Sequence, residues 1–531
     1  MLKRFLWASW VVAAIPAGAG VIVNPGGIIE TIVADPVRNV FYASLDTNEV
    51  VIVSTAGSVS DRVTVSGNPD ALAVARDGTA LYVALEDTHD VAVYDLPGLT
   101  FRTNYDLSAT STGPTGLVEK AGRLYALSNS GLSIVDTANG DELYYGQPPG
   151  SIFSWFYSSL ATLSPNGQLL YALVTGLSPA SLYVFNVSTD VPVYIGEDCC
   201  DGCIGSNAQQ MAISPDGSRA YVAAGSTYYL QVLSTTPLLH AEAAVATGPY
   251  PNSVVLSADG ARLFVGYASP TFAVARTSDW LPFHVGPLQG SLADGGLALS
   301  PDESSLAAVI NYQGGQSNRI ELVGVASPVV NRGGLRVRPL DAPTGVPIGS
   351  ASLTPTPYAG WSTYVEVREG YFGLAPLPAG AVEADLTATG HAGQTFNTSV
   401  VPGTWTDLGD VTLARTGTLP APNEVCVSPA AFIGGTTSVE VHGSGFLPEP
   451  GLTFESTDPG IVVDNFEFVD WATIRATISV DAAELPGVLL YAAKVTNPDG
   501  QWGTGDFLLK ENLFADGFET GDVLHWSASV P

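Results

Sequence analysis

An internal repeat constrains the fold of this 531-residue chain more than any other feature. Each copy has an apolar run, a turn of the Ser-Pro-Asp-Gly kind, and a second apolar run that usually contains an aromatic residue. From the clearest to the weakest, the copies span 71–84, 211–223, 254–266, 160–171, 297–307, 33–42 and 117–125. A chain built from such copies favours a repeating β-architecture with many tight turns over separate unrelated strands.

The spacing of the copies identifies that architecture. The aligned positions 42, 82, 125, 171, 221, 264 and 307 are separated by 40, 43, 46, 50, 43 and 43 residues. Periods in the forties are typical of propeller blades with four short strands each. A single blade cannot bury both faces, so closing a ring supplies the missing partners. We therefore predict an all-β chain with a seven-bladed β-propeller over residues 20–330, in which Ile22–Val33 contributes a closing strand.

The sequence of one copy also points to a family. Residues 214–223 read Ser-Pro-Asp-Gly-Ser-Arg-Ala-Tyr-Val-Ala, which resembles the YVTN-type propeller repeats of secreted and surface-layer bacterial proteins. That superfamily also contains lactonase-like enzymes and subunits of quinone-dependent amine dehydrogenases. The resemblance implies the fold of residues 21–330, whereas propellers carry many unrelated activities.

The residues after the repeat change character. Residues 331–415 contain Thr-Gly-Val-Pro-Ile at 344–348 and Leu-Pro-Ala-Gly at 377–380. This order resembles the carboxypeptidase regulatory-like module, which implies a small transthyretin-like β-sandwich without peptidase chemistry. No zinc-ligand spacing is present in this segment.

A linker rich in Pro and Thr at 416–423 precedes a further unit at 424–510. This unit contains Gly-Ser-Gly-Phe at 443–446 and Asn-Pro-Asp-Gly at 497–500. It resembles an IPT/TIG domain, which implies an immunoglobulin-like fold that serves as a spacer or adhesive module. We interpret His442 as a strand residue, because no second metal-type side chain lies at useful spacing.

The two termini predict export. Lys3 and Arg4 precede an apolar run at 5–15, and Ala-Gly-Ala at 17–19 is typical of a signal peptidase site. We predict a signal peptide at 1–19, with an uncleaved anchor as the alternative. The expected location is extracellular or at the cell surface, or alternatively the periplasm. No later apolar run reaches the roughly 18 residues of a membrane span.

Residues 511–531 resemble a short tail found at the C-terminus of many secreted bacterial proteins. Their aromatic residues flank acidic turns, and the segment is too short to fold alone. The tail serves either export and surface retention or packing on the neighbouring domain.

The charge balance excludes some classes of partner. The chain has 20 Lys and Arg against 51 Asp and Glu, for a formal net charge of −31. Such a surface is repelled by nucleic acid and by anionic membranes. We therefore expect neither as a partner.

Two clusters near residue 200 have more than one interpretation. The cysteines are Cys199, Cys200, Cys203 and Cys426. In an exported protein they favour a disulfide, with a metal site as the alternative. Covalent haem is excluded because Ile204 replaces the required histidine. The acids Glu197, Asp198 and Asp201 are either a calcium site or a solvated turn, and no other cofactor is expected.

Enzymatic activity has no positive support from individual residues of the sequence. Glu86 and His89 would need an arginine such as Arg276 at the same channel mouth to favour a lactonase-like or quinoprotein-associated enzyme. No nucleophile elbow or phosphate-binding loop occurs. We therefore predict no catalytic residues and interpret the chain as a binding scaffold for a protein or glycan, with a structural surface-layer component as a further alternative.

Aromatic residues in the propeller loops are the expected contacts of that scaffold, since aromatics provide contact area at a low entropic cost. Packing between blades is the alternative role for each. The candidates are Tyr144, Tyr145, Trp155, Phe156, Tyr157, Tyr228 and Tyr229.

Overall fold

A computed structural model of the chain describes residues 20–510 with internal gaps. The gaps are 108–112, 147–158, 176–179, 198–203, 205, 226–228, 236–238, 246–247, 249, 313–315, 349–350, 357–364, 368–369, 418–420, 429–430, 433, 449–450, 456–459, 472 and 482–488. The regular elements of the described part are β-strands, and the prediction of an all-β chain is confirmed. This part contains no helix of the length and apolar character that a membrane crossing requires.

The N-terminal region is a succession of four-stranded antiparallel sheets. In each, consecutive strands are neighbours. The first sheets are β2 (Ile29–Ala34), β3 (Val40–Leu45), β4 (Glu49–Ser54) and β5 (Val59–Thr64); β6 (Pro69–Val74), β7 (Ala80–Leu85), β8 (Asp90–Asp95) and β9 (Thr100–Asp106); β10 (Gly116–Lys120), β11 (Arg123–Ser128), β12 (Gly131–Asp136) and β13 (Glu142–Gly146); and β14 (Ser159–Leu163), β15 (Leu169–Val174), β16 (Ser181–Asn186) and β17 (Val193–Glu197).

The remaining sheets of the region follow the same order, except that the sheet of β18–β21 continues into strands of the next unit and the last sheet recruits β1. They are β18 (Ala208–Ile213), β19 (Arg219–Ala224), β20 (Tyr229–Ser234) and β21 (His240–Val245); β22 (Pro251–Leu256), β23 (Arg262–Tyr267), β24 (Thr271–Arg276) and β25 (Pro282–Pro287); and β26 (Ser291–Leu299), β27 (Ser305–Asn311) and β28 (Arg319–Gly324) with β1 (Val21–Val23).

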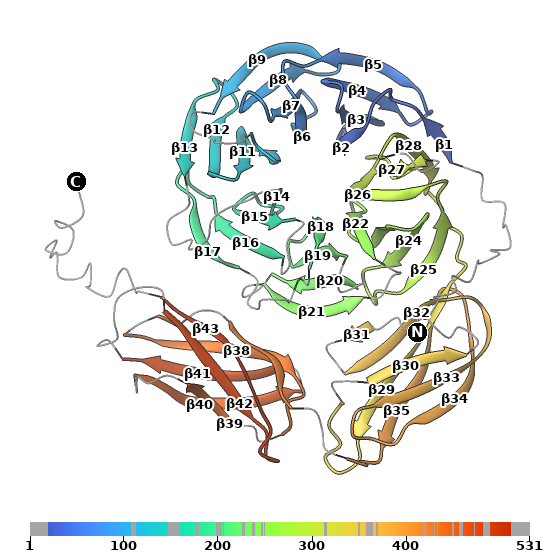
Figure 1. The fold of residues 1–531 in the computed structure, drawn as a ribbon, viewed down its shortest axis with the longest axis vertical. Helices are drawn as coiled ribbons and strands as arrows, with labels where there is room; N and C mark the ends of the chain where they lie inside the picture. Colours follow the sequence, from blue (N-terminus) through green and yellow to red (C-terminus); the bar gives the residue numbers. More distant parts are fainter. Residues whose placement is uncertain are drawn as a thin grey trace, which may run out of the picture.

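These sheets stand side by side around an axis and form a β-propeller (Figure 1). The first strand of each sheet is innermost and contacts the first strand of the next, and β26 contacts β2 to close the ring. Closure is reinforced by β1, whose residues pair antiparallel with β28 in the register Val21↔Leu322 and Val23↔Ile320. A closing strand is therefore present, and it shares Ile22 and Val23 with the predicted range, whose later residues belong to β2.

The repeated turn explains why the copies are recognisable in sequence. In the turn after β18, Ser214 Oγ donates to Asp216 Oδ1 at 2.6 Å, and the same oxygen accepts the N–H of Ser218 at 3.0 Å. Gly217 adopts the positive φ of 74° that the turn requires. The turns after β22 and β26 form the same Ser-to-Asp hydrogen bond. Each Ser-Pro-Asp-Gly turn is thus a self-contained hydrogen-bonded unit that ends one strand and begins the next.

The aligned positions of the repeat form one layer of the core. All seven lie in the second strand of their sheet and are buried, with 4% exposure or less. They are Tyr42, Tyr82, Tyr125, Tyr171, Tyr221, Phe264 and Ala307. Because each sheet packs its faces against its two neighbours, these side chains fill the space between sheets.

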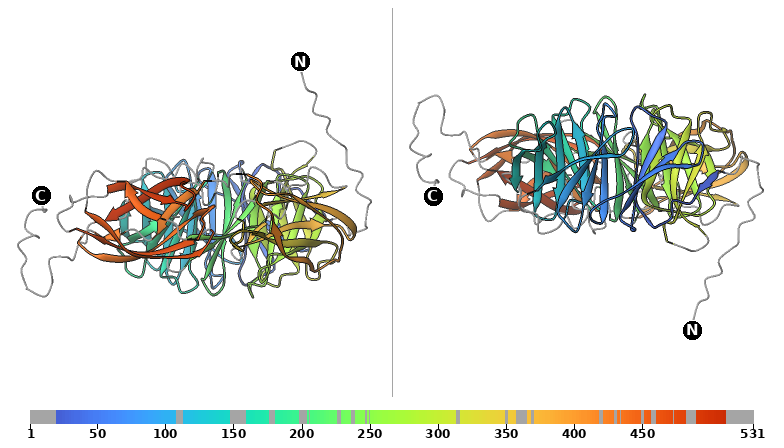
Figure 2. Two further views of the ribbon diagram at one scale, coloured as in Figure 1. Left: turned by 90° about the horizontal axis from the view of Figure 1, so that it is seen from below. Right: turned by 90° about the horizontal axis from the view of Figure 1, so that it is seen from above.

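Two further units follow the propeller, each with two sheets around one apolar core. The first has β29 (Gly333–Asp341), β30 (Ala351–Thr356), β31 (Val365–Val367), β32 (Tyr371–Leu377), β33 (Gly380–Ala388), β34 (Gln394–Val400) and β35 (Trp405–Leu413). The second has β36 (Asn423–Ser428), β37 (Ala431–Phe432), β38 (Thr436–Ser444), β39 (Gly451–Glu455), β40 (Ile461–Asp470), β41 (Thr473–Val480), β42 (Leu489–Thr496) and β43 (Trp502–Lys510). Both units lie beside the ring rather than over its faces (Figure 2).

The first of these units is attached to two neighbouring sheets of the propeller. Its strand β31 pairs antiparallel with β21, with Ala243 opposite Val367. The side chain of Asn331 exchanges hydrogen bonds of 3.0 Å with the backbone of Val285 on β25. Trp405 Nε1 also donates to the carbonyl of Asp279 at 3.0 Å. The last unit contacts the preceding one through buried Trp471, whose ring stacks on Phe372.

The turn geometry predicts an acid-sensitive contribution to stability. Hydrogen bonds from Ser214 and Ser218 lower the pKa of Asp216 to about 2. Asp216 therefore stabilises the fold above the ordinary pKa of 3.8, and this contribution is lost as the pH falls toward 2. We expect Asp216→Asn to lower the free energy of unfolding by about 1 kcal/mol at neutral pH, measured by calorimetry. Asp106→Asn, an exposed position on β9, is the control, and an equal loss in both variants would contradict the prediction.

Candidate functional site

The innermost strands carry a recurrent irregularity at one end. In β2, β6, β18, β22 and β26 the pairing register with the second strand shifts near the start of the inner strand. Such bulges redirect a side chain out of the regular alternation. The polar residues within these bulges are Glu30, Asp70, Gln209, Asn252 and Asp294. Polar side chains thus recur around the ring axis at the end where the inner strands begin.

Four carboxylates form an acidic cluster at this end, namely Glu30, Asp46, Asp70 and Glu86. Glu30 and Asp70 belong to neighbouring inner strands, and Asp46 and Glu86 directly follow the adjacent second strands β3 and β7. Burial, reinforced by the charges of Glu86 and Glu30, raises the pKa of Asp70 to about 6. Burial, followed by the charges of Asp46 and Glu86, raises the pKa of Glu30. The fold therefore holds like charges together at a cost.

Two hydrogen bonds to neighbouring described residues act on this cluster. Asn68 Nδ2 donates to Glu86 Oε2 at 2.9 Å, and Asp46 Oδ1 accepts the N–H of Ile28 at 2.8 Å. These contacts orient two of the four acids without neutralising any charge. Perturbed carboxylates without a structural counter-charge are typical of binding and catalytic sites.

Amide and hydroxyl side chains extend the polar layer around the ring. Thr115 and Ser159 share a hydrogen bond of 3.0 Å between their hydroxyl oxygens. Asn252 is fully buried, and its Nδ2 donates to the carbonyl of Leu292 and to Asp294 Oδ1, both at 3.1 Å. Asn252 Oδ1 has no hydrogen-bond partner among the described residues.

The predicted aromatic contacts fall partly within the described residues. Tyr144 and Tyr145 lie on β13, the outer strand of its sheet, and both are half-buried. Tyr144 packs against the core between neighbouring sheets, as the packing alternative expects. Tyr229 begins β20 and is also half-buried. Trp155, Phe156, Tyr157 and Tyr228 lie outside the described residues, so the assignment of this set as binding contacts stays a prediction.

The cysteine and calcium predictions also remain predictions. Cys199, Cys200, Cys203, Asp198 and Asp201 lie outside the described residues. Cys426 lies on β36 and Glu197 ends β17. In the described part of the chain, no three His, Cys, Asp or Glu side chains gather closely enough to hold a metal ion.

His442 lies within a strand. It is part of β38 and is buried, with Nε2 3.4 Å from Glu440 Oε2.

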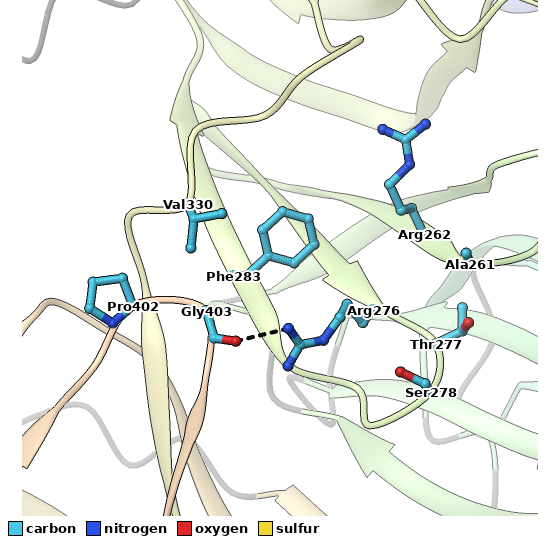
Figure 3. A pocket seen from close by; sticks show the side chains of 9 residues that line it. All are labelled: Ala261, Arg262, Arg276, Thr277, Ser278, Phe283, Val330, Pro402 and Gly403. Carbon is cyan, nitrogen blue, oxygen red and sulfur yellow. Dashed lines mark hydrogen bonds between the residues drawn. The ribbon is translucent and has the colours of Figure 1, made fainter.

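The three residues of the enzymatic alternative do not converge. Glu86 and His89 follow β7 at the acidic end, whereas Arg276 ends β24 at the opposite end of its sheet. Arg276 pairs with Asp279 at 2.6 Å and donates to the carbonyl of Gly403 at 2.8 Å (Figure 3). It thus lines a cavity of about 610 Å³ between β23–β25 and the following unit. Antiparallel strands place these residues at opposite ends, which removes the arrangement that would favour catalysis.

Sequence analysis missed the acidic cluster, although a signal exists. Glu30, Asp70, Gln209 and Asn252 each precede their aligned aromatic position by twelve residues. A fixed offset within a repeat implies a fixed place in the fold. Aligning the segments before the apolar runs would have found these residues.

Comparison with known proteins gives structural similarity only. No family model and no curated protein matches the chain. Among solved structures, Kuenenia stuttgartiensis hydrazine synthase matches at 16% identity and a TM-score of 0.46, covering 61% of this chain and 99% of that chain. The β-propeller domain of Myceliophteria thermophila Cps50 (Swd1) matches at 16% identity and a TM-score of 0.46, and the match covers 58% of this chain and 100% of that domain. A chain of a mitotic checkpoint complex matches at 14% identity and a TM-score of 0.46, and the match covers 61% of this chain and 97% of that chain.

The raised pKa of Asp70 gives a stability prediction. The folded protein holds the Asp70 proton up to a pH of about 6, against an ordinary pKa of 3.8. The free energy of unfolding therefore falls as the pH rises from about 4 through 6. We expect Asp70→Asn to stabilise the propeller by up to about 3 kcal/mol above pH 7, with no gain below the ordinary pKa. Calorimetry across this range tests it, and a variant that is destabilised above pH 7 would refute it.

Proposed function

We propose that the chain is an exported, non-catalytic binding protein whose seven-bladed propeller recognises a protein or a glycan at the cell surface. One observation carries the proposal: Glu30, Asp70 and Glu86 lie at the same end of two neighbouring sheets, where burial and their like charges raise the pKa of Asp70 to about 6. A repulsive arrangement of this kind weakens the fold. A ligand that interacts with these carboxylates would explain why the protein keeps an arrangement that weakens its fold.

The chemistry of the acidic end restricts the ligand. Carboxylates accept hydrogen bonds and attract positive charge. Sugar hydroxyls and the basic side chains of a protein are donors of that kind. Both would relieve the repulsion among Glu30, Asp70 and Glu86, so either class gains from binding there.

The chain enters and leaves the connections between sheets at the acidic end, which supports this end as the binding face. The segments that contain Trp155–Tyr157 and Cys199–Cys203 join the end of one sheet to the start of the next. The described residues that flank them, such as Gly146 and Ser159, lie at the acidic end. In this proposal the aromatic residues supply contact area, and a disulfide among the cysteines constrains the connection that contains them.

The remaining parts of the chain fit an exported scaffold. Residues 331–415 act as a carboxypeptidase regulatory-like β-sandwich and residues 424–510 as an IPT/TIG domain, and both are spacers. Because these units lie beside the ring, they leave both ends of the propeller accessible. Residues 1–19 direct export, and the tail at 511–531 serves export or surface retention.

Removing the acids tests the function. The full chain is probed on an immobilised glycan library and on a library of lysine- and arginine-containing peptides. Combining Glu30→Gln, Asp70→Asn and Glu86→Gln should weaken binding at least tenfold, or about 1.4 kcal/mol. Glu383→Gln, which removes an exposed carboxylate on β33, is the control for loss of an acid elsewhere in the chain. The melting temperature of the triple variant is compared with that of the wild type, so that a loss of binding through unfolding is recognised.

Other outcomes identify the alternatives. Unchanged binding in the triple variant contradicts the assignment of the acidic end. Hydrolysis of lactones by the full chain favours the enzymatic alternative, and ordered self-assembly of the purified protein favours a surface-layer component. Hits on the glycan library alone or on the peptide library alone decide between the two classes of ligand.

A further inference from the structure

The opposite end of the propeller contains a second polar site. A cavity of about 290 Å³ lies where four consecutive inner strands, β2, β6, β10 and β14, finish and the repeated turns begin. Its lining includes Arg76, Glu119 and Lys120. Two cations thus share one cavity in a chain with a formal net charge of −31.

Arg76 differs from the other arginines of the ring. Its guanidinium forms no ion pair or hydrogen bond with the residues that the structure describes, and only its backbone N–H is bonded, to Glu119 Oε2 at 3.1 Å. Arg319 lies near the ring of Tyr312 instead of pairing with an acid. The arginines that pair with carboxylates are Arg38, Arg62, Arg102, Arg123, Arg219, Arg262 and Arg276.

Lys120 is held in place without a counter-charge. Its Nζ donates to the carbonyl of Ser164 at 3.0 Å and to the carbonyl of Pro165. The side chain passes close to Gly167, where an added Cβ would lie 2.9 Å from Lys120 Cδ. Burial, followed by the charge of Arg76, lowers the pKa of Lys120. Two of its three donors are used, so one remains for a ligand.

Glu119 does not neutralise this pair. Its Oε2 accepts the N–H of Arg76, and its Oε1 accepts the N–H of Gly122 at 3.0 Å. No ion pair joins it to either cation in the described chain. We propose that the cavity binds the oxyanion group of a small molecule, such as a phosphate, sulfate or carboxylate, between Arg76 and Lys120.

Titration of the full chain with inorganic phosphate, sulfate and malonate at constant ionic strength tests this site by calorimetry. Arg76→Gln should weaken binding of the preferred anion roughly tenfold or more. Arg319→Gln, which removes the same charge elsewhere in the ring, should leave binding unchanged. Because the Lys120 side chain also donates hydrogen bonds to the turn at Ser164 and Pro165, its loss can weaken the fold. Lys120→Gln is therefore included only if its melting temperature matches that of the wild type.

The outcomes separate clearly. Preference for phosphate or sulfate assigns a tetrahedral oxyanion, and preference for malonate assigns a carboxylate. No binding of any of the three anions, or equal weakening in Arg76→Gln and Arg319→Gln, would overturn the proposal. The residues changed to test the proposed function lie at the other end of the inner strands. A negative result for the anion site therefore does not contradict the proposed function, and the reverse also holds.

A different observation concerns the first described residue. The N–H of Gly20 donates to the carboxylate of Glu321, and the carbonyl of Gly20 accepts Gln289 Nε2 at 2.8 Å. Glu321 lies on β28 and is only 1% exposed. Its Oε2 accepts the N–H of Gln289 at 2.6 Å. Glu321 is therefore a buried carboxylate that is bonded to amides.

No cation accompanies Glu321 among the described residues, and burial raises its pKa. The contact with Gly20 is also too close for any side chain, because an added Cβ would lie 2.5 Å from Glu321 Oε1. A buried carboxylate without a counter-charge is costly. The backbone nitrogen of Gly20 lies where a cation would neutralise this carboxylate.

Signal peptide removal would place a cation there. Hydrolysis of the Ala19–Gly20 bond by water leaves a carboxylate on Ala19 and an α-ammonium on Gly20, which is protonated at neutral pH. We infer that this cleavage supplies the counter-ion of Glu321 and so strengthens the pairing of β1 with β28. The inference rests on the predicted cleavage after Ala19.

Chains that begin at different positions test the pairing. A chain beginning at Gly20, released from a cleavable fusion, is compared with its N-acetylated form, which keeps the N–H and removes the charge. The free amine should raise the melting temperature by several degrees, and Glu321→Gln should abolish this difference. An equal difference in Glu321→Gln, or none in the wild type, would overturn the inference. N-terminal sequencing of exported protein that begins at a residue other than Gly20 would also overturn it.

Discussion

The pairing of β1 with β28 is the interaction on which the rest of the propeller depends. Each sheet has two faces that must be covered, and only a closed ring provides a neighbour for every face. Residues from the start of the chain complete the last sheet, so closure joins segments about 300 residues apart. The positions of all inner strands, and of the polar groups at their ends, follow from that closure.

Closure also gives the molecule two chemically different ends. Inner strands begin at one end, where bulges bring Glu30 and Asp70 together with Glu86, and finish at the other, where the turns surround Arg76 and Lys120. The same strand order produces both ends, because every inner strand runs in one direction. The acidic cluster and the cavity of Arg76 and Lys120 therefore lie at opposite ends of the inner strands. This separation reduces the mutual neutralisation of the two groups.

The repeat was predictable from sequence because its information is local. Ser214, Asp216 and Gly217 form a complete hydrogen-bonded turn within five residues, and Tyr221 follows at a fixed distance. The acidic cluster was not predicted, since Glu30 and Asp70 become neighbours only after two sheets pack. Glu86 and Arg276, whose convergence would favour the enzymatic alternative, lie apart because the direction of each strand decides at which end its last residue lies. Half-buried Tyr144 packs against the core between sheets, so an aromatic residue in the outer strand contributes to packing as well as to the surface.

The double attachment of the unit after the propeller has a mechanical consequence. Through β31 it is joined to β21, and through Asn331 and Trp405 it is joined to the neighbouring sheet around β25. It therefore acts as a brace across one joint of the ring, and tension arriving from the C-terminal side is shared between two sheets. One of these two sheets, formed by β22–β25, packs directly on the sheet that β1 completes, so the brace also stiffens the ring beside the β1–β28 seam.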